Sequence, residues 1–140
     1  MKRKSRFTLL EVMIVLMLLV ILAGAVTPAY LNYMKKARVQ TAKSECKLLA
    51  DAVDHYYLEL GTYPSTLEGL IKNIDNDTRW AGPYINGKLP KDPWGGSYKI
   101  SFPGKAGDFD IVCTGSDKKS GGSGDGADIF SSDIGDSEEK

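Results

Sequence analysis

The feature that most constrains this chain is an apolar stretch near its N-terminus, residues 7–27, which read FTLLEVMIVLMLLVILAGAVT. Apart from Glu11 and a threonine near each end, the stretch contains only apolar side chains and glycine. As an α-helix rising about 1.5 Å per residue it would reach roughly 30 Å, the thickness of a bilayer's hydrocarbon core. We therefore expect a transmembrane helix.

The residues that flank this stretch indicate its orientation. Residues 1–6 contain four basic side chains, which favour a cytoplasmic N-terminus and export of the remainder. A cleaved secretory signal peptide is the alternative, since residues 23–25, AGA, could imitate its cleavage site. The apolar run is longer than the core of such a peptide, about 7–15 residues, and a charged helical pattern follows Pro28 directly.

Glu11 places a carboxylate inside the apolar span, at a cost of about 2.5–3.5 kcal/mol on insertion scales. One interpretation is that Glu11 lies near the membrane interface and its carboxylate reaches out to the headgroups. The interpretation that we favour is a pair with a positive charge that another chain supplies inside the membrane, because intramembrane charges are usually retained for a partner.

Composition limits what remains after the span. The chain has 140 residues and a formal net charge of zero, with 18 basic and 18 acidic side chains. Because four basic residues lie in residues 1–6, the rest carries 14 basic and 18 acidic side chains, a net charge of −4. A single small acidic domain of about 110 residues is left, and such a domain does not suggest a nucleic-acid partner.

Residues 30–60 are predicted to be helical. Apolar side chains recur there at spacings of three and four, which draws one stripe along a helix. The stripe consists of Val39, Ala42, Cys46, Leu49, Val53, Tyr56 and Leu60. With no breaker between Pro28 and Gly61, the span and the amphipathic segment should form one long helix, bent near Pro28 and ended at Gly61.

The two cysteines, Cys46 and Cys113, exclude a disulfide-rich scaffold. Cys46 on the apolar stripe is most simply a small buried hydrophobe. The two could also form a disulfide if the domain folds in an oxidising compartment. Both interpretations remain open, because spacing in the sequence gives no distance.

The second half of the chain reads as a short helix, a loop and a hairpin. Pro64 fits a turn, and Ser65 or Thr66 could cap a short helix through Ile71. Residues 75–95 should be a loop that Tyr84 and Ile85 anchor. Residues 97–102 and 109–113 alternate as half-buried strands do, with Pro and Gly between them, which predicts an antiparallel hairpin lying on the helix stripe.

Residues 114–128, TGSDKKSGGSGDGAD, lack large apolar side chains. They would suit a flexible linker. They would also suit a calcium loop, since Asp117, Asp125 and Asp128 offer carboxylates and the glycines let carbonyl groups turn inward. The EF-hand spacing fails, because Lys119 and Gly121 stand where Asp or Asn is needed.

The start of the span resembles the signal of type IV pilin-like proteins on the run Phe7–Met13, FTLLEVM. This resemblance implies that a prepilin peptidase cuts between Arg6 and Phe7, that the amine of Phe7 is methylated, and that Glu11 stays in the membrane for assembly. Pro28 matches the family's helix-bending proline. Arg6 stands where the family usually has Gly, and Val20 replaces a glycine midway along the span.

The segments GTYPSTLEGL (61–70) and LPKDPWGGSYKI (89–100) are similar to those of the major pseudopilins of type II secretion systems. The order of segments also matches, over roughly residues 6–129. The resemblance implies an α+β, type IV pilin-like fold, in which a long N-terminal helix packs on a small antiparallel sheet with a C-terminal calcium loop. The calcium ligands it implies are Asp117, Asp125, Asp128 and carbonyl groups near Thr114 and Ser123.

The chain should then comprise a cytoplasmic leader (1–6), a transmembrane and filament-core helix (7–29), a periplasmic domain (30–129) and an acidic flexible tail (130–140). We expect a pseudopilus subunit for protein secretion across the outer membrane. Its expected partners are copies of itself, other pseudopilins, an inner-membrane assembly platform and prepilin peptidase. It would sit in the inner membrane before assembly and in a periplasmic filament afterwards.

Two other functions fit the same residues. One is a pilin of a surface fibre or DNA-uptake system, and the other is a monomeric, membrane-tethered calcium-binding domain. An enzyme is not expected, since the sequence has one histidine, His55, and contains no Ser–His–Asp, Cys–His, zinc or phosphate-loop pattern.

Overall fold

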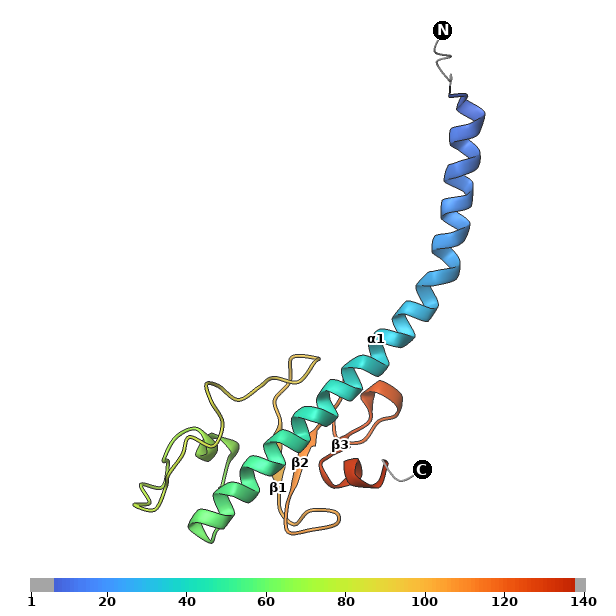
Figure 1. Ribbon diagram of the computed structural model, residues 1–140. Coiled ribbons are helices and arrows are strands. Elements are labelled where there is room, and N and C mark those ends of the chain that lie inside the picture. The colour runs from blue at the N-terminus through green and yellow to red at the C-terminus, as the bar shows by residue number, and fades with distance from the viewer. Residues whose placement is uncertain (1–6, 138–140) are drawn as a thin grey trace. The chain divides into compact units, whose positions relative to one another are not determined.

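The computed structural model describes residues 7–137. They form a long α-helix, α1 (Leu9–Leu60), and three strands, β1 (Lys99–Ser101), β2 (Asp110–Cys113) and β3 (Ile129–Phe130) (Figure 1). Three 3₁₀ segments lie between and after them, η1 (Leu67–Leu70), η2 (Gly124–Gly126) and η3 (Ser132–Ser137). The chain divides after Lys36 into two compact units, and α1 contributes to both.

The helix α1 is continuous, with Pro28 inside it. At its start, the backbone N–H of Glu11 donates to the hydroxyl oxygen of Thr8 (3.2 Å), which satisfies a donor that the first turn leaves free. At its end, Gly61 has φ +72° and its N–H donates to the Tyr57 carbonyl (2.8 Å). The prediction of one uninterrupted helix that ends at Gly61 is confirmed.

In the second unit, one face of α1 is buried. The buried residues are Ala42, Cys46, Leu49, Ala52, Val53, Tyr56 and Leu60. The predicted stripe is therefore confirmed from Ala42 onward, while Val39 is partly buried against the same core. Ala52 belongs to the face although the sequence analysis did not include it. His55 is exposed, as expected for a solvated helix face.

The sheet has the order β1-β2-β3 and is antiparallel throughout. Ile100 pairs with Ile111, and Cys113 pairs with Ile129. Ile111, Cys113 and Ile129 belong to the same buried cluster as the α1 face. The predicted hairpin is confirmed, but β1 is shorter than the predicted strand, and Phe102 lies beyond its end with 46% of its surface exposed.

The connections agree with the predictions in outline. The short helix is a 3₁₀ turn, η1, and Thr66 at its N-cap makes no side-chain capping bond. Tyr84 and Ile85 anchor the following loop, since both N–H groups donate to the Leu70 carbonyl (2.8 and 3.4 Å). In the DPWG turn, Asp92 Oδ1 accepts from the N–H groups of residues 94 and 96 (2.9 and 2.7 Å).

The predicted boundary at residue 129 is wrong. Phe130 lies in β3, the η3 segment follows it, and Ile134 packs against the core. Lys105 also holds this end, with its ammonium 3.5 Å from the centre of the Phe130 ring and 3.0 Å from Asp133 Oδ2. The fold therefore continues into the segment predicted to be a flexible tail; residues 138–140 lie outside the described residues.

The buried carboxylate of Asp110 explains why this end is folded. It accepts hydrogen bonds from the N–H of Lys105 (2.7 Å), the N–H and hydroxyl of Ser132 (2.9 and 3.0 Å) and the hydroxyl of Ser131 (3.0 Å). Burial alone would raise the pKa of Asp110, but these hydrogen bonds outweigh it and lower the pKa. Asp110 thus ties the chain after β3 to the hairpin.

Candidate functional site

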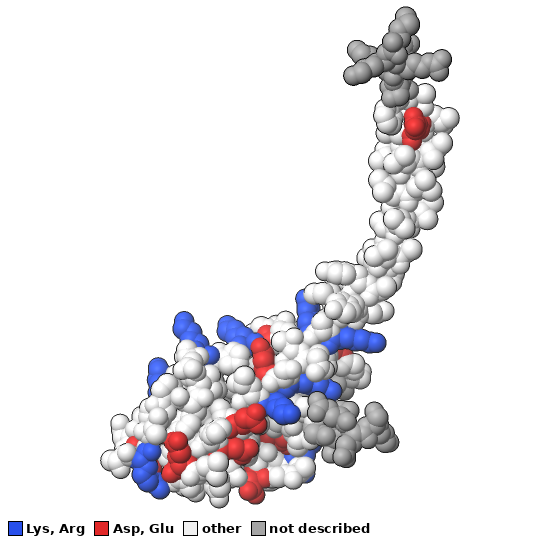
Figure 2. All heavy atoms as spheres, viewed as in Figure 1, with Lys and Arg blue, Asp and Glu red and all other residues white. Residues whose placement is uncertain are grey.

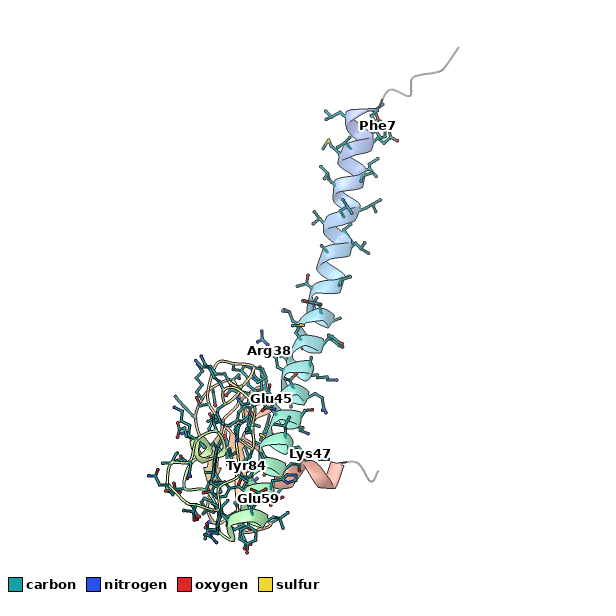
Figure 3. All side chains as sticks on the ribbon, turned by 60° about the vertical axis from the view of Figure 1, so that its left-hand side comes forward. Phe7, Arg38, Glu45, Lys47, Glu59 and Tyr84 are labelled. Atoms are coloured by element: carbon teal, nitrogen blue, oxygen red, sulfur yellow. The ribbon has the colours of Figure 1, made fainter. Side chains whose placement is uncertain are left out.

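The N-terminal half of α1 has an apolar surface on all sides. Its large apolar side chains from Phe7 to Val26 are between 45% and 79% exposed. Figure 2 shows this half almost free of charged side chains, and in Figure 3 its side chains radiate in every direction. Its most apolar 18-residue window has a mean hydropathy of 2.9 and is 0% buried, so by length and composition it could cross a membrane.

An α-helix that is apolar all round needs lipid or other helices around it. Burial of one apolar side chain is worth about 1.5–3 kcal/mol relative to exposure. Within the described residues, the apolar window is 0% buried. The cover must therefore come from a bilayer or from other molecules, and this surface is the first candidate functional site.

Glu11 is the one acidic residue in the first turn of α1. Its backbone is fixed by the Thr8 cap, and Thr8 and Glu11 have the spacing of a capping box. Phe7, the predicted new N-terminus, precedes the helix and is 78% exposed. Arg6, on the other side of the predicted cleavage site, lies outside the described residues, so cleavage and methylation stay predictions.

The loop 114–128 is the second candidate site. It is closed by a hydrogen bond from Ser116 N–H to the Asp125 carbonyl (2.9 Å). Asp117 Oδ1 accepts from the N–H of Lys119 (3.0 Å). Asp128 Oδ2 accepts from the N–H of Gly121 (2.9 Å). The two arms of the loop are therefore held together by the Asp125 backbone carbonyl and the Asp128 carboxylate, whereas the Asp117 bond lies within one arm.

Two observations show how this loop suits a cation. Asp128 Oδ1 is buried and has no hydrogen-bond partner, an arrangement that costs free energy unless a donor or cation approaches. A Cβ atom on Gly122 would collide with the Gly126 carbonyl oxygen and lie 2.9 Å from Asp117 Oδ2, so two oxygens crowd one small space. Hard oxygen donors of this kind are what Ca²⁺ prefers.

The described residues contain no group of three His, Cys, Asp or Glu side chains placed to share one ion. Asp117, Asp125 and Asp128 therefore lie on one closed loop without meeting at a point. Of the predicted carbonyl ligands, that of Ser123 accepts from the N–H of Gly126 (3.1 Å), and Thr114 leads from β2 into the loop. The donors fit calcium by chemistry, and binding would require their side chains to converge.

Cys46 and Cys113 are both free thiols and fully buried, in one core cluster. The disulfide considered from the sequence stays a prediction, and the interpretation of Cys46 as a small buried hydrophobe agrees with the structure. Burial, together with the neighbouring Cys113, raises the pKa of Cys46 to about 12. Burial raises the pKa of Cys113 to about 11, and its thiol lies 3.6 Å from Asp92 Oδ2.

Two tyrosine–carboxylate contacts, which the sequence analysis did not predict, attach the rest of the domain to α1. The Tyr84 hydroxyl donates to Glu59 (2.6 Å; both labelled in Figure 3), and the Tyr98 hydroxyl donates to Glu45. Burial and the hydrogen bond to Glu59 raise the pKa of Tyr84 to about 12. Both tyrosines therefore remain neutral donors at physiological pH.

Comparison with known proteins places these features in a family. The profile described as "Type II secretion system (T2SS), protein G" matches residues 29–132. The chain belongs to the type II secretion system protein G family. The profile "Prokaryotic N-terminal methylation motif" matches residues 1–27, the predicted leader and most of the span.

Relatives in the protein G family support the assignment along nearly the whole chain. The type II secretion system core protein G of Pseudomonas aeruginosa is 40% identical over 134 residues, which cover 91% of this chain and 94% of that protein. The core protein G of Vibrio cholerae is 41% identical over 135 residues, 92% of each chain.

A solved structure supports the protein G fold. The crystal structure of the major pseudopilin from the type 2 secretion system of enterohaemorrhagic Escherichia coli matches with a TM-score of 0.59 and 30% identity, over 71% of this chain and 90% of that chain. The predicted α+β, pilin-like architecture is confirmed. The family also supports a structural role in secretion rather than an enzymatic one.

Proposed function

We propose that this chain is a structural subunit of a periplasmic pseudopilus, a filament that drives type II secretion of proteins across the outer membrane. The observation that carries the proposal is the surface of Phe7 and the first half of α1 up to Val26, whose large apolar side chains are all at least 45% exposed. Membership of the protein G family supports the same function.

Assembly follows from the physics of this surface. In the inner membrane, lipid covers the apolar half of α1. On extraction from the bilayer, the same half must be buried against copies of itself or other pseudopilins. Repeated head-to-tail contacts that do not close produce a fibre. The domain of residues 37–137 stays in the periplasm, and an inner-membrane platform carries out the extraction.

Processing prepares the start of the helix. Prepilin peptidase removes residues 1–6 by cleavage between Arg6 and Phe7, and the amine of Phe7 is then methylated. In the filament, Glu11 of one subunit pairs with the Phe7 amine of a neighbour. The pair removes two uncompensated charges from an apolar core, where one unpaired charge would be strongly destabilising.

Calcium is the proposed cofactor of the loop 114–128. Asp117, Asp125 and Asp128, with carbonyl groups near Thr114 and Ser123, would hold the ion. The ion would supply a compact positive charge that neutralises the carboxylates and satisfies Asp128 Oδ1. Lys118 and Lys119 lie beside Asp117 in the sequence and weaken the site to some extent.

Electron microscopy of cells that overproduce the chain tests the filament proposal. We expect periplasmic or surface-extended fibres with the native chain and none with Glu11→Ala. The matched control is Asp51→Ala, which removes an exposed carboxylate from the second half of the same helix and should leave fibres intact. If cells that overproduce the native chain form no fibres, the proposal is overturned.

A gene deletion separates the secretion role from an uptake role. Deleting the gene should block export of secreted enzymes and leave DNA uptake unchanged.

A further inference from the structure

We propose that Asn86 is a site of spontaneous chemical modification, at which its side-chain amide is converted to a carboxylate through a cyclic imide formed with the backbone nitrogen of Gly87. The co-reactant is water. The inference concerns the domain of residues 37–137 and depends on neither the filament proposal nor the calcium proposal.

The sequence offers the most favourable residue pair for this chemistry at one place. Of the four asparagines in the chain, only Asn86 is followed by glycine. The other three, Asn32, Asn73 and Asn76, precede Tyr, Ile and Asp. The imide ring closes when the backbone nitrogen of the next residue attacks the side-chain carbonyl carbon, and a side chain on that next residue hinders the attack. Glycine has no Cβ and reaches backbone conformations that other residues avoid.

The structure leaves both reacting groups accessible. Asn86 and Gly87 are exposed and lie in the loop after Ile85, outside every helix and strand that the structure describes. Gly87 has φ +90°, and a Cβ built there would meet nothing within 4 Å. Among residues 7–137, no hydrogen bond holds the Asn86 side chain or the Gly87 N–H. The nitrogen that attacks and the amide that leaves are therefore not tied to other groups.

Asn73 and Asn32 are held in ways that Asn86 is not. The side-chain nitrogen of Asn73 donates to the Asp77 carbonyl (2.9 Å), and its side-chain oxygen accepts from the Asp77 N–H (3.0 Å). Ring closure at Asn73 would break both hydrogen bonds. Asn32 lies inside α1, where the regular helix backbone holds the following N–H. The fold therefore protects these two positions and leaves Asn86 unprotected.

The proposed step balances without an oxidant or a reductant. The Gly87 nitrogen forms a bond to Cγ of Asn86, the bond from Cγ to Nδ2 breaks, and ammonia leaves with the proton of the Gly87 N–H. Water then opens the ring at one of its two carbonyl carbons. Opening at Cγ gives aspartate, and opening at the backbone carbonyl carbon gives isoaspartate, in which the main chain runs through Cβ and Cγ. Either product carries a new carboxylate.

The new carboxylate would lie on a groove that is already acidic. Asn86 and Lys88 line a groove of about 560 Å³ together with Glu45 and Asp51 of α1. Tyr84 and Glu45, both labelled in Figure 3, belong to the loop side and the helix side of this groove. A modified subunit therefore differs from a newly made one by one negative charge at the groove, and a charged ligand would bind the two forms differently.

The test is incubation of the full chain in detergent at mildly alkaline pH, once folded and once in urea, followed by peptide mass spectrometry. In the folded chain, Asn86 should be modified at least about tenfold faster than Asn73, a difference of about 1.4 kcal/mol in activation free energy. Urea should change the rate at Asn86 by less than about threefold, because the loop is already accessible. The rate at Asn73 should rise in urea, since its two hydrogen bonds are lost.

Three variants identify the reacting groups. Gly87→Ala should slow modification at Asn86 at least about tenfold, because a Cβ then hinders the attack. Gly95→Ala is the matched control and should keep the native rate, since Gly95 has a similar φ (+81°) in open space but follows Trp94. Asn86→Gln keeps the amide but would have to close a larger ring, and it should stay unmodified over the same period.

Each outcome decides the inference. It is wrong if folded Asn86 reacts no faster than Asn73, or if modification of Asn86 requires urea. It is also wrong if Gly87→Ala keeps the native rate, or if Gly95→Ala slows the reaction as much as Gly87→Ala does. Circular dichroism shows whether each variant is folded. If Gly87→Ala is unfolded, the comparison of the native chain with and without urea decides, because it uses no variant.

Discussion

The two halves of α1 share one continuous backbone but have opposite surroundings. From Ala42 to Leu60, one face is buried in the core of the chain's own domain, and the other faces carry mainly charged and polar side chains, with Leu48 and Leu58 also exposed. From Leu9 to Val26, every large apolar side chain is exposed. The apolar face of the second half is therefore buried within the molecule, whereas the apolar surface of the first half needs lipid or other subunits to cover it.

This difference separates folding from assembly within a single helix. Substitutions in the second half should change the stability of the domain. Substitutions in the first half should leave the domain folded and change how subunits associate. The following experiments test that separation.

The largest effect is expected from the same leucine-to-alanine substitution made in each half of α1. Leu49, 0% exposed, is in the core, and Leu49→Ala should lower the free energy of unfolding by about 2–5 kcal/mol. Leu16, 56% exposed, is in the first half, and Leu16→Ala should change it by less than about 0.5 kcal/mol while reducing fibre formation. Denaturant unfolding of the full chain in detergent, followed by the fluorescence of Trp80 and Trp94, measures both. Equal losses would contradict the separation.

Asp110→Asn should cost about 1–3 kcal/mol at neutral pH, because an amide cannot accept all the hydrogen bonds that converge on Asp110. The folded state lowers the pKa of Asp110 below its ordinary 3.8, so its contribution is present above that value and is lost as the pH falls through the lowered pKa.

Urea midpoints at neutral pH and at a series of acidic pH values check this prediction. The native chain and Asp110→Asn should differ most at neutral pH and converge in acid. Asp51→Asn, on the exposed side of α1, is the control and should follow the native chain at every pH. A gap that stays constant down to strong acid would show that ionisation of Asp110 does not contribute.

Glycine-to-alanine changes at Gly61 and Gly24 should have opposite signs. Gly61 ends α1 with φ +72°, where an L-residue costs about 1–2 kcal/mol, so Gly61→Ala should destabilise the domain. Gly24 lies inside the helix with nothing within 4 Å of a Cβ, and alanine there should favour the helix by about 0.5–1 kcal/mol. Thermal melting followed by far-UV circular dichroism distinguishes them, and two changes of the same sign would be unexpected.

The smallest effect is expected at the two cysteines, which should stay reduced and unreactive in the folded chain. Both cysteines are buried free thiols with raised pKa values. A thiol reagent should therefore modify neither in the folded chain and both in denaturant. Mass spectrometry without reductant should give the mass of the dithiol. A mass lower by two hydrogens would show that the bond between Cys46 and Cys113 forms in the cell.

Much of this fold could be predicted because its larger elements carry periodic patterns. The apolar run and the spacing of three and four residues indicated α1, and the alternation around Ile100 and Ile111 indicated the hairpin. β3 was missed because two residues, Ile129 and Phe130, are too few to show any period. Asp110 was missed because alternation placed it on the polar side of its strand, and the serines that donate to it come 21 and 22 positions later.

The calcium loop shows the same limit at a candidate site. Composition identified the three aspartates as donors, and the glycines were read only as flexible. Sequence could not separate Gly122 from Gly121, because the difference between them is the nearness of Gly126 and Asp117 in space. The structure therefore distinguishes between glycines that the sequence alone cannot tell apart.

The hydrogen bonds between Asp110 and the serines at 131 and 132 mean that the domain is complete only when the chain has been synthesised through Ser132. Before that point, a growing chain would hold an interior anion lacking most of its hydrogen-bond donors. A product ending before Ser131 would keep α1 but leave the Asp110 carboxylate without three of its four hydrogen bonds. Ser131 and Ser132 therefore close the interior of the domain from outside the hairpin.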